Sequence, residues 1–216
     1  MTNRLLVFTM LVLAGLTSIA RAEPASARCE TLVPNADLSA CDFSGRSLAG
    51  MNLNGANLAG AKLETANLRG TQLNGTNLRG ANLKWANLTR AGLRDADLRD
   101  ADLFHSILDE ADMNAARVGK ANLFGANLIG THATGADFTG AYLKDVLMER
   151  IDLSGGSLAD VYMLRGVISG GRFVNANLAH ADMTGAAAEN SDFTGADLSG
   201  TRLAGASLRA AVFRNT

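Results

Sequence analysis

The sequence predicts an all-β solenoid, a rod built of stacked coils, and three observations lead to it. An apolar residue occupies every fifth position from Leu38 to Phe213 without an insertion, which gives 36 consecutive units. The residue two positions before the apolar centre is nearly always small, and it is Ala in 21 of these units. A period of five fits neither the 3.6 of a helix nor the 2 of an extended strand. Each unit must therefore turn a corner, with the centre and the small residue inward and three residues outward.

Single units of this kind bury nothing alone, so the coils must stack on one another to form a core. A Gly or Asn in nearly every unit disfavours helix. The residue before the centre is Asp in ten units and Asn in nine, and Gly often closes the unit. Outward polar ladders around an aliphatic interior are therefore expected.

The composition of the chain excludes several functional classes. The 47% apolar fraction argues against a disordered chain, and the 5% aromatic fraction argues against a conventional enzyme core. The 20 basic and 21 acidic residues leave no bulk positive field for nucleic acid.

The N-terminal segment has the pattern of a secretory signal peptide. Arg4 precedes a short apolar run over residues 5–14, and Ala20-Arg21-Ala22 offers a cleavage site after Ala22. The run is too short to span a bilayer in the usual way, so membrane contact is expected only if the segment stays uncleaved. We expect a signal peptide over 1–22 and a periplasmic or secreted product; the pattern leaves both destinations open.

Residues 23–35 are the candidate cap for the first end of the solenoid, which occupies 36–216. An uncovered solenoid end exposes edges that pair with other chains. Cys29 and Cys41 lie twelve residues apart, and Cys41 falls at a small inward position. In an oxidising compartment they are candidates for a disulfide that fastens the cap to the first coil, and two free buried thiols are the alternative.

The units resemble those of the pentapeptide-repeat family, A-[D/N]-L-x-x. Ala56-Asn57-Leu58-Ala59-Gly60 is a representative copy, and the resemblance extends from Ala36 to Asn215. It implies a right-handed quadrilateral parallel β-helix with four units per coil and about nine coils. At roughly 4.8 Å between stacked strands, such a rod is about 40 Å long.

Taking centres twenty residues apart divides the rod into four faces. We number them by their first centres: face 1 starts at Leu38, face 2 at Phe43, face 3 at Leu48 and face 4 at Leu53. The small position is unusually large at Val146 and Ile151. One coil later the same positions hold Gly166 and Gly171, so we expect large and small residues to compensate within the core.

No arrangement of residues points to catalysis, a metal or a cofactor. His105, His132 and His180 fall on different positions of the unit without metal-ligand spacing, and we expect them to face solvent. Each Gly closes a unit instead of opening a helix, so no phosphate loop is present, and the Ser residues lack a positioned base. We expect no catalytic, metal or cofactor-binding residues, and hence no enzyme.

The outward positions of faces 2 and 3 depart from the polar pattern. Face 3 carries aliphatic residues before its centres, face 2 carries two tyrosines there, and more apolar residues follow the face 2 centres. Contiguous apolar residues on a soluble protein often mark a binding surface, and Trp and Tyr are favoured anchors. Mere reinforcement of neighbouring coils is the alternative. This candidate interaction stripe consists of Trp85, Phe104, Ile107, Phe124, Tyr142, Leu147, Tyr162, Leu164 and Val167.

The sequence therefore favours a non-catalytic exported solenoid that acts as a protein-interaction or scaffold module in the cell envelope, with an unidentified protein partner. The resemblance also implies a DNA mimic that binds and protects gyrase. That role requires a strongly negative surface, whereas the chain after cleavage has a net charge of only −3.

A purely structural, self-associating rod is a further alternative. Nothing after the last unit covers Phe213 except Arg214, Asn215 and Thr216. The predicted stack of Phe173, Phe193 and Phe213 therefore ends near an uncapped coil, and a homodimer through this coil is possible. Members of the resembled family dimerise through C-terminal regions, although the positive charge of Arg209 and Arg214 would oppose it here.

Overall fold

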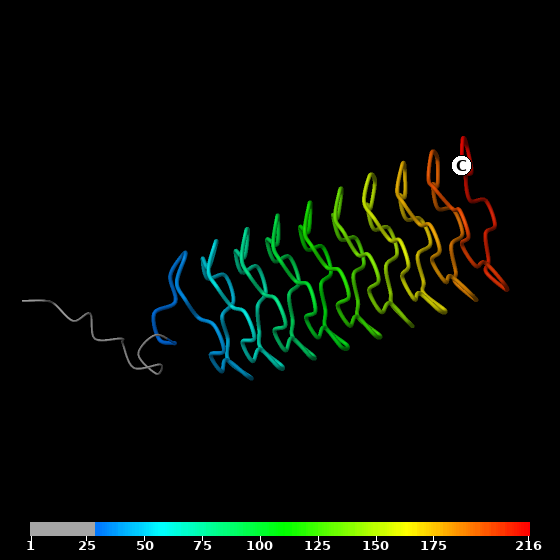
Figure 1. The fold of residues 1–216 in the computed structure, drawn as a ribbon. Coiled ribbons are helices and arrows are strands. Elements are labelled where there is room, and N and C mark those ends of the chain that lie inside the picture. The colour runs from blue at the N-terminus through cyan, green and yellow to red at the C-terminus, as the bar shows by residue number, and fades with distance from the viewer. Residues whose placement is uncertain (1–28) are drawn as a thin grey trace, which may run out of the picture.

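The computed structural model describes residues 29–216, which form a straight rod of regularly stacked coils (Figure 1). The predicted signal peptide, 1–22, and the first part of the predicted cap lie outside the described residues. Between residues 29 and 216 the backbone forms no helix and no strand longer than one bridging residue. It forms 32 parallel bridges instead, each joining a residue to the one twenty positions later.

These bridges form four ladders, one for each predicted face. The ladders run from Asp37 to Asp197, from Asp42 to Arg202, from Ser47 to Ser207 and from Asn52 to Val212. Every bridging residue directly precedes an apolar centre, so the outward residue of the unit lies on the ladder. One coil therefore contains four five-residue units, and the predicted register of twenty is confirmed.

Hydrogen bonds between coils and within turns explain why the period is five. The N–H of Leu58 donates to the carbonyl of Asn77 at 2.7 Å, and the N–H of Asn57 donates back to Ala36 at 2.9 Å. Within the coil, the N–H of Ala61 donates to Leu58 at 3.0 Å and closes a turn. In each unit, therefore, two residues form a turn and three lie along one side of the rod.

Glycine closes many units because the second turn residue has a left-handed backbone. Its φ is +63° at Gly60 and +56° at Thr65. Glycine adopts this region without a steric penalty, while Asn, Asp and His tolerate it better than most other residues. A type II turn has the same requirement at its third position. The turn therefore explains the Gly-rich fifth position of the unit.

The core is a column of apolar centres surrounded by the small residues. Leu58, Leu83 and Ala56 are fully buried, as are nearly all of their equivalents before the last coil. Where the small residue is Thr or Ser, its hydroxyl donates to a backbone carbonyl. The Thr71 hydroxyl bonds to Leu48 at 2.9 Å, and the Ser106 hydroxyl bonds to Leu103 at 2.8 Å. These buried hydroxyls are therefore satisfied.

The two enlarged inward positions, Val146 and Ile151, are each followed one coil later by a glycine. A Cβ added at Gly166 would lie 2.7 Å from Cγ of Met163 and 3.3 Å from Cγ1 of Val146, so Gly166 leaves room for both side chains. A Cβ added at Gly171 would lie 2.7 Å from the Phe173 ring and 2.8 Å from the carbonyl oxygen of Ile168. Close packing therefore requires both glycines, and the compensation between Ile151 and Gly171 stays a prediction.

The N-terminal end of the described chain is covered. Cys29 and Cys41 form a disulfide, and Leu32 packs against the core. Three inward positions of the first coil, normally small, are filled by Cys41, Arg46 and Met51. Arg46 reaches the cap, where its Nη1 lies 3.4 Å from Oε1 of Glu30. Larger side chains fit here because the cap, and no preceding coil, lies beside them.

The C-terminal end is open. Leu198, Leu203 and Leu208 are only partly buried, and Phe213 is 40% exposed although its ring stacks on Phe193 at 5.2 Å. The N–H groups of these four centres, which pair with the next coil elsewhere in the rod, donate to no backbone carbonyl within residues 29–216. Within residues 29–216, no segment covers the last coil.

Candidate interaction surface

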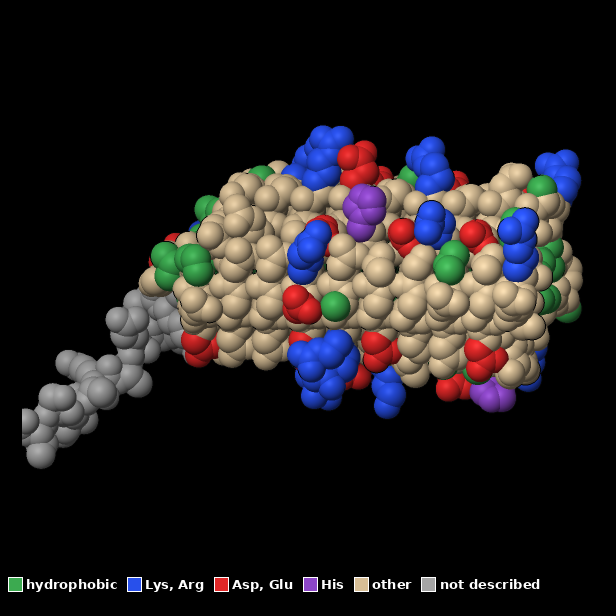
Figure 2. Space-filling model, turned by 90° about the horizontal axis from the view of Figure 1, so that it is seen from above, with side chains coloured by type: hydrophobic (Ala, Val, Ile, Leu, Met, Phe, Trp, Pro, Cys, Tyr) green, Lys and Arg blue, Asp and Glu red, His purple; other side chains and the backbone are tan. Residues whose placement is uncertain are grey.

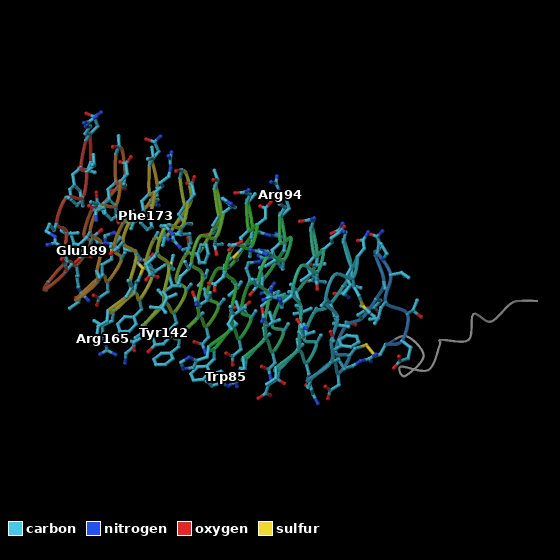
Figure 3. All side chains as sticks on the ribbon, turned by 180° about the vertical axis from the view of Figure 1, so that it is seen from behind. Trp85, Arg94, Tyr142, Arg165, Phe173 and Glu189 are labelled. Carbon is cyan, nitrogen blue, oxygen red and sulfur yellow. A yellow bond between two sulfur atoms is a disulfide. The ribbon has the colours of Figure 1, made fainter. Side chains whose placement is uncertain are left out.

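Aromatic side chains form a continuous file along one edge of the rod. Trp85 contacts Phe104 edge-on at 5.5 Å, and Phe104 stacks on Phe124 at 5.4 Å. The file continues through Tyr142 at 6.2 Å and Tyr162 at 5.3 Å. Figure 3 places Trp85 and Tyr142 on this edge. Residues about twenty apart come to ring-stacking distance because the coils repeat at the spacing of paired strands.

His105 belongs to this aromatic file, although sequence reasoning placed it in solvent. Its ring stacks on Trp85 at 4.5 Å with an interplanar angle of 7°, and it contacts Phe104 at 4.4 Å. Its imidazole is thus half-buried between neighbouring rings. The signal that could have found it is the offset of twenty from Trp85, which places both residues on the second turn position after a face 2 centre.

The residues of the predicted stripe divide into two neighbouring sets. The aromatic set follows face 2 and the corner between faces 2 and 3. The aliphatic set lies on the face 3 ladder, where Leu147 bridges to Val167. Trp85 is 52% exposed, and Ile107, Tyr142, Leu147 and Tyr162 are each slightly more than one third exposed. The other members, Phe104, Phe124, Leu164 and Val167, are half-buried.

Face 3 differs from the other faces in the charge of its ladder. From Ser47 to Ser207 no ladder residue on this face is charged, whereas the other three ladders each include several Asp, Lys or Arg residues. Its middle part presents Ile107, Leu147 and Val167. Face 3 therefore offers an uncharged, partly apolar strip along the rod axis.

The border of this strip toward face 2 is electrically balanced. Arg165 donates two hydrogen bonds of 2.7 Å to the carboxylate of Asp145, which lowers the pKa of Asp145 and raises that of Arg165. The ammonium group of Lys144 lies 5.7 Å from the centroid of the Phe124 ring. On this border, both cations therefore have partners: Arg165 pairs with Asp145, and Lys144 lies over the Phe124 ring.

The border toward face 4 carries two carboxylates, Asp109 and Glu149, that form no ion pair within residues 29–216. Asp109 follows Ile107 by two residues, and Glu149 follows Leu147 by two. Burial raises the pKa of Asp109, and the negative charges of Glu110 and Glu149 raise it further. The Oε2 atom of Glu149 is buried, and no hydrogen-bond partner for it exists among residues 29–216.

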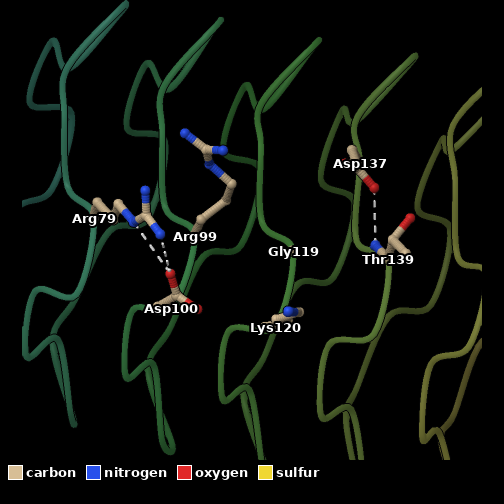
Figure 4. A pocket seen from close by; sticks show the side chains of 7 residues that line it. All are labelled: Arg79, Arg99, Asp100, Gly119, Lys120, Asp137 and Thr139. Atoms are coloured by element: carbon tan, nitrogen blue, oxygen red, sulfur yellow. Dashed lines mark hydrogen bonds and ion pairs between the residues drawn. The ribbon is translucent and has the colours of Figure 1, made fainter.

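Elsewhere the surface mixes charges of both signs (Figure 2). A depression lies over Gly119, beside Arg79, Arg99 and Lys120 (Figure 4). Arg79 pairs with Asp100 at 3.1 Å, and Arg99 pairs with a carboxylate at 2.6 Å. Because both guanidinium groups are already paired, we assign no anion site to this depression.

Residues 29–216 contain neither a metal-binding cluster nor a membrane-spanning helix. Over residues 29–216 no group of three or more His, Cys, Asp or Glu side chains is placed to hold a metal ion. In the same part of the chain no helix has the length and apolar character needed to cross a membrane.

A family model for pentapeptide repeats matches residues 36–75, 66–103, 120–158, 172–209 and 191–216. The chain belongs to the pentapeptide repeat family. Proteins of this family form right-handed quadrilateral β-helices, in agreement with the four ladders, and the match indicates no enzyme family. No curated protein matches the chain significantly.

Solved structures of pentapeptide repeat proteins are similar to this chain. HetL of the cyanobacterium Nostoc sp. strain PCC 7120, described as involved in heterocyst differentiation regulation, is 27% identical, with a TM-score of 0.43 over 80% of this chain and 90% of HetL. QnrB1, described as a plasmid-mediated fluoroquinolone resistance protein, is 17% identical, with a TM-score of 0.40 over 82% and 92%. A protein of the Arabidopsis thaliana thylakoid lumen is 26% identical, with a TM-score of 0.27 over 65% and 77%.

Proposed function

We propose that this pentapeptide repeat protein is an exported, non-catalytic interaction module of the cell envelope that binds a partner protein through the stripe. The observation that carries the proposal is the exposed, uncharged strip of face 3 beside the aromatic file. Trp and Tyr side chains contribute strongly to binding when a partner covers them. Exposed apolar residues that run together along one edge favour binding over chance exposure.

The rigidity of the rod supports this proposal. The rings of Tyr142 and Tyr162 are held by stacking, and the backbone of each stripe residue is hydrogen-bonded to a neighbouring coil. A surface ordered before binding loses little conformational entropy when a partner arrives. The stripe therefore suits a partner that lies flat along several coils.

Export to an oxidising compartment is part of the proposal. The signal-peptide pattern of residues 1–22 supports it, and so does the Cys29–Cys41 disulfide, because such bonds persist outside the reducing cytosol. Protease accessibility of the intact cell and its periplasmic fraction would test it, with accumulation of the full-length chain in the cytosol as the contrary result.

The binding proposal is tested by substituting Tyr142, Leu147 and Tyr162 with Ser. A control variant carries Ser at three ladder positions of faces 1 and 4, His132, Arg172 and Asn177. Both variants should keep the wild-type circular dichroism spectrum, because all six side chains point outward. An envelope protein retained by the wild type and the control, and lost by the stripe variant, is the expected result. Equal retention by the stripe variant would reject the stripe as the binding surface.

Trp85 supplies an independent readout, because it is the single tryptophan of the chain and lies at the end of the aromatic file. Titration of the retained partner into the wild type should shift the emission of this half-exposed indole to shorter wavelength. The control variant should show the same shift. An unchanged spectrum at saturating partner would place the contact away from this edge.

Self-association through the C-terminal coil is a second candidate function, favoured by the open end described above. The unpaired N–H groups and the exposed ring of Phe213 form a sheet edge of the kind that pairs with another chain. Light scattering at high concentration should detect a dimer that Phe213→Lys dissociates. A wild-type monomer under those conditions would reject this candidate, with repulsion between copies of Arg209 and Arg214 as the physical reason.

The charge distribution does not favour the DNA-mimic alternative. In the middle of the rod Arg94 pairs with Asp112, and Lys84 pairs with Asp102 at 3.1 Å, so no continuous acidic surface runs along it. A DNA supercoiling assay with gyrase should accordingly show no inhibition at low micromolar protein.

A further inference from the structure

The carboxylates on the border of face 3 toward face 4 indicate the charge of the segment that the stripe binds. We propose that the stripe receives a protein segment whose apolar side chains cover Ile107 and Leu147, and which places a lysine or arginine beside Asp109 and Glu149. This inference rests on the proposed function, because it assumes that the stripe is a binding surface. It adds the charge of the occupant and the two carboxylates that recognise it.

The position of the carboxylates is set by the repeat. Both occupy the first turn position after a face 3 centre, so each lies two residues from an exposed aliphatic residue of the ladder. They are two coils apart, about 10 Å, with Ile129 on the coil between them. An occupant that lies along face 3 therefore meets both acidic groups along one side.

Neither carboxylate has a cation of its own in the described chain. Asp109 accepts a hydrogen bond of 3.0 Å from the N–H of Ile129, and the charged groups that act on it are Glu110 and Glu149, both negative. Glu149 has a buried oxygen without a partner. The neighbouring Arg150 forms no ion pair with either group among residues 29–216.

The other acidic groups on the same border are already satisfied. Glu110 accepts a hydrogen bond of 2.7 Å from Arg90. Glu189 accepts one of 2.7 Å from the hydroxyl of Ser169. Asp109 and Glu149 thus differ from their neighbours, because a half-buried carboxylate without a cation is costly and gains most from an incoming one.

The same charges argue against a lipid surface as the occupant. The aromatic residues by themselves would suit a membrane interface, but the half-buried carboxylates of Asp109 and Glu149 border the strip and would oppose anionic headgroups. Face 3 contributes no ladder cation to offset this repulsion. A basic and apolar protein segment matches both the strip and its border.

The test uses the full chain, processed in the cell, and three labelled synthetic peptides of equal length: alternating Leu and Lys, alternating Leu and Glu, and alternating Ser and Lys. Fluorescence anisotropy should give the Leu/Lys peptide at least tenfold higher affinity than either of the others. Equal binding of the Leu/Lys and Leu/Glu peptides would overturn the proposal, and so would equal binding of the Leu/Lys and Ser/Lys peptides.

The recognising carboxylates are tested with Asp109→Asn and Glu149→Gln combined, which keeps the shape and the acceptor for Ile129. The control combines Asp95→Asn and Asp160→Asn, two exposed residues on other corners that give the same change in net charge. The first variant should bind the Leu/Lys peptide about tenfold more weakly, which is about 1.4 kcal/mol. If the control loses as much affinity, the effect comes from net charge alone, and the proposal is overturned.

Two further results separate this inference from the proposed function. If the envelope partner is lost by the stripe variant but kept by the Asp109/Glu149 variant, the inference fails while the binding function stands. If the stripe variant keeps the partner, the proposed function itself fails. Binding to phosphatidylglycerol vesicles that disappears in the stripe variant would overturn the inference in favour of a lipid surface.

Discussion

Replacing Leu83 with Ala should cost far more stability than the same replacement at Leu203. Both residues are centres on face 2, but Leu83 lies in the middle of the rod and is fully buried, while Leu203 belongs to the open last coil. The change removes three carbon atoms, worth about 2.4 kcal/mol in lost transfer free energy. The cavity left at Leu83 adds to this and brings the total into the range of about 3–5 kcal/mol.

At Leu203 the same three carbons are already partly in contact with water, and no coil follows to enclose a cavity. We therefore expect a loss of about 1 kcal/mol there. The pair is closely matched, because residue type, face and position in the unit are identical. Only the presence of a following coil differs between the two sites.

Urea unfolding followed by far-UV circular dichroism measures both losses. Native-state hydrogen exchange locates them, since the amide of Leu83 donates to Asp102 in the next coil at 2.7 Å. Leu83→Asp is the stronger version and should unfold several coils. Equal destabilisation at both sites, or a normal melting temperature for Leu83→Asp, would refute the burial of Leu83 and the register that places it inside.

Three other predictions follow from single contacts. Replacing both Cys29 and Cys41 by Ser should lower the free energy of unfolding by about 3 kcal/mol, because the disulfide closes a short loop of the cap. Amide exchange should become faster in the first coil only. Unchanged exchange in that coil would contradict the role of the disulfide in holding the cap. Hydrogen bonds from serine hydroxyls lower the pKa of Glu189 from 4.5 to about 2. Its contribution to stability is therefore complete above pH 4.5 and is lost as the pH falls through 2. An NMR titration of its carboxyl with a midpoint near 4.5 would exclude this. Gly171→Ala should destabilise the rod by about 1–3 kcal/mol through contact of the new Cβ with a neighbouring ring, whereas Gly119→Ala meets no atom closer than 3.4 Å and should be nearly neutral; thermal melts of the two variants compare them directly.

The sequence was sufficient for the register of the rod, because the repeat is local and unbroken. Every unit repeats the same three demands: a small inward residue, an apolar centre and a left-handed turn residue. Leu58 and Leu78 could be placed on one face from their spacing alone. The Phe173, Phe193 and Phe213 stack followed in the same way, and the structure contains it at ring distances of 5.0 and 5.2 Å.

Contacts between side chains of different positions in the unit were harder to predict. A Cβ at Gly171 would meet the ring of Phe173, a contact that the repeat pattern did not indicate. His105 was placed in solvent, yet it stacks on Trp85. The offset of twenty places His105 in line with Trp85, but the direction of the rings, which spacing does not specify, decided that they stack face to face.

The candidate site shows the same division. Spacing placed the stripe residues on neighbouring faces, since a period of twenty puts equivalent positions in line. Spacing did not reveal which charges beside them are paired. Arg165 finds Asp145 one coil away, while Asp109 and Glu149 find no cation, and that difference arises only when side chains of known length extend from fixed positions.

The sequence by itself determined the architecture of this protein: a repeated five-residue unit, its inward and outward positions, and four faces whose composition could be written down in advance. Only the tertiary structure decided how the two ends differ, which rings stack, and which carboxylates remain without a cation. The physical reason is that backbone pairing in a solenoid repeats from coil to coil and follows from local sequence. Charge pairing and ring packing depend on the reach and direction of individual side chains.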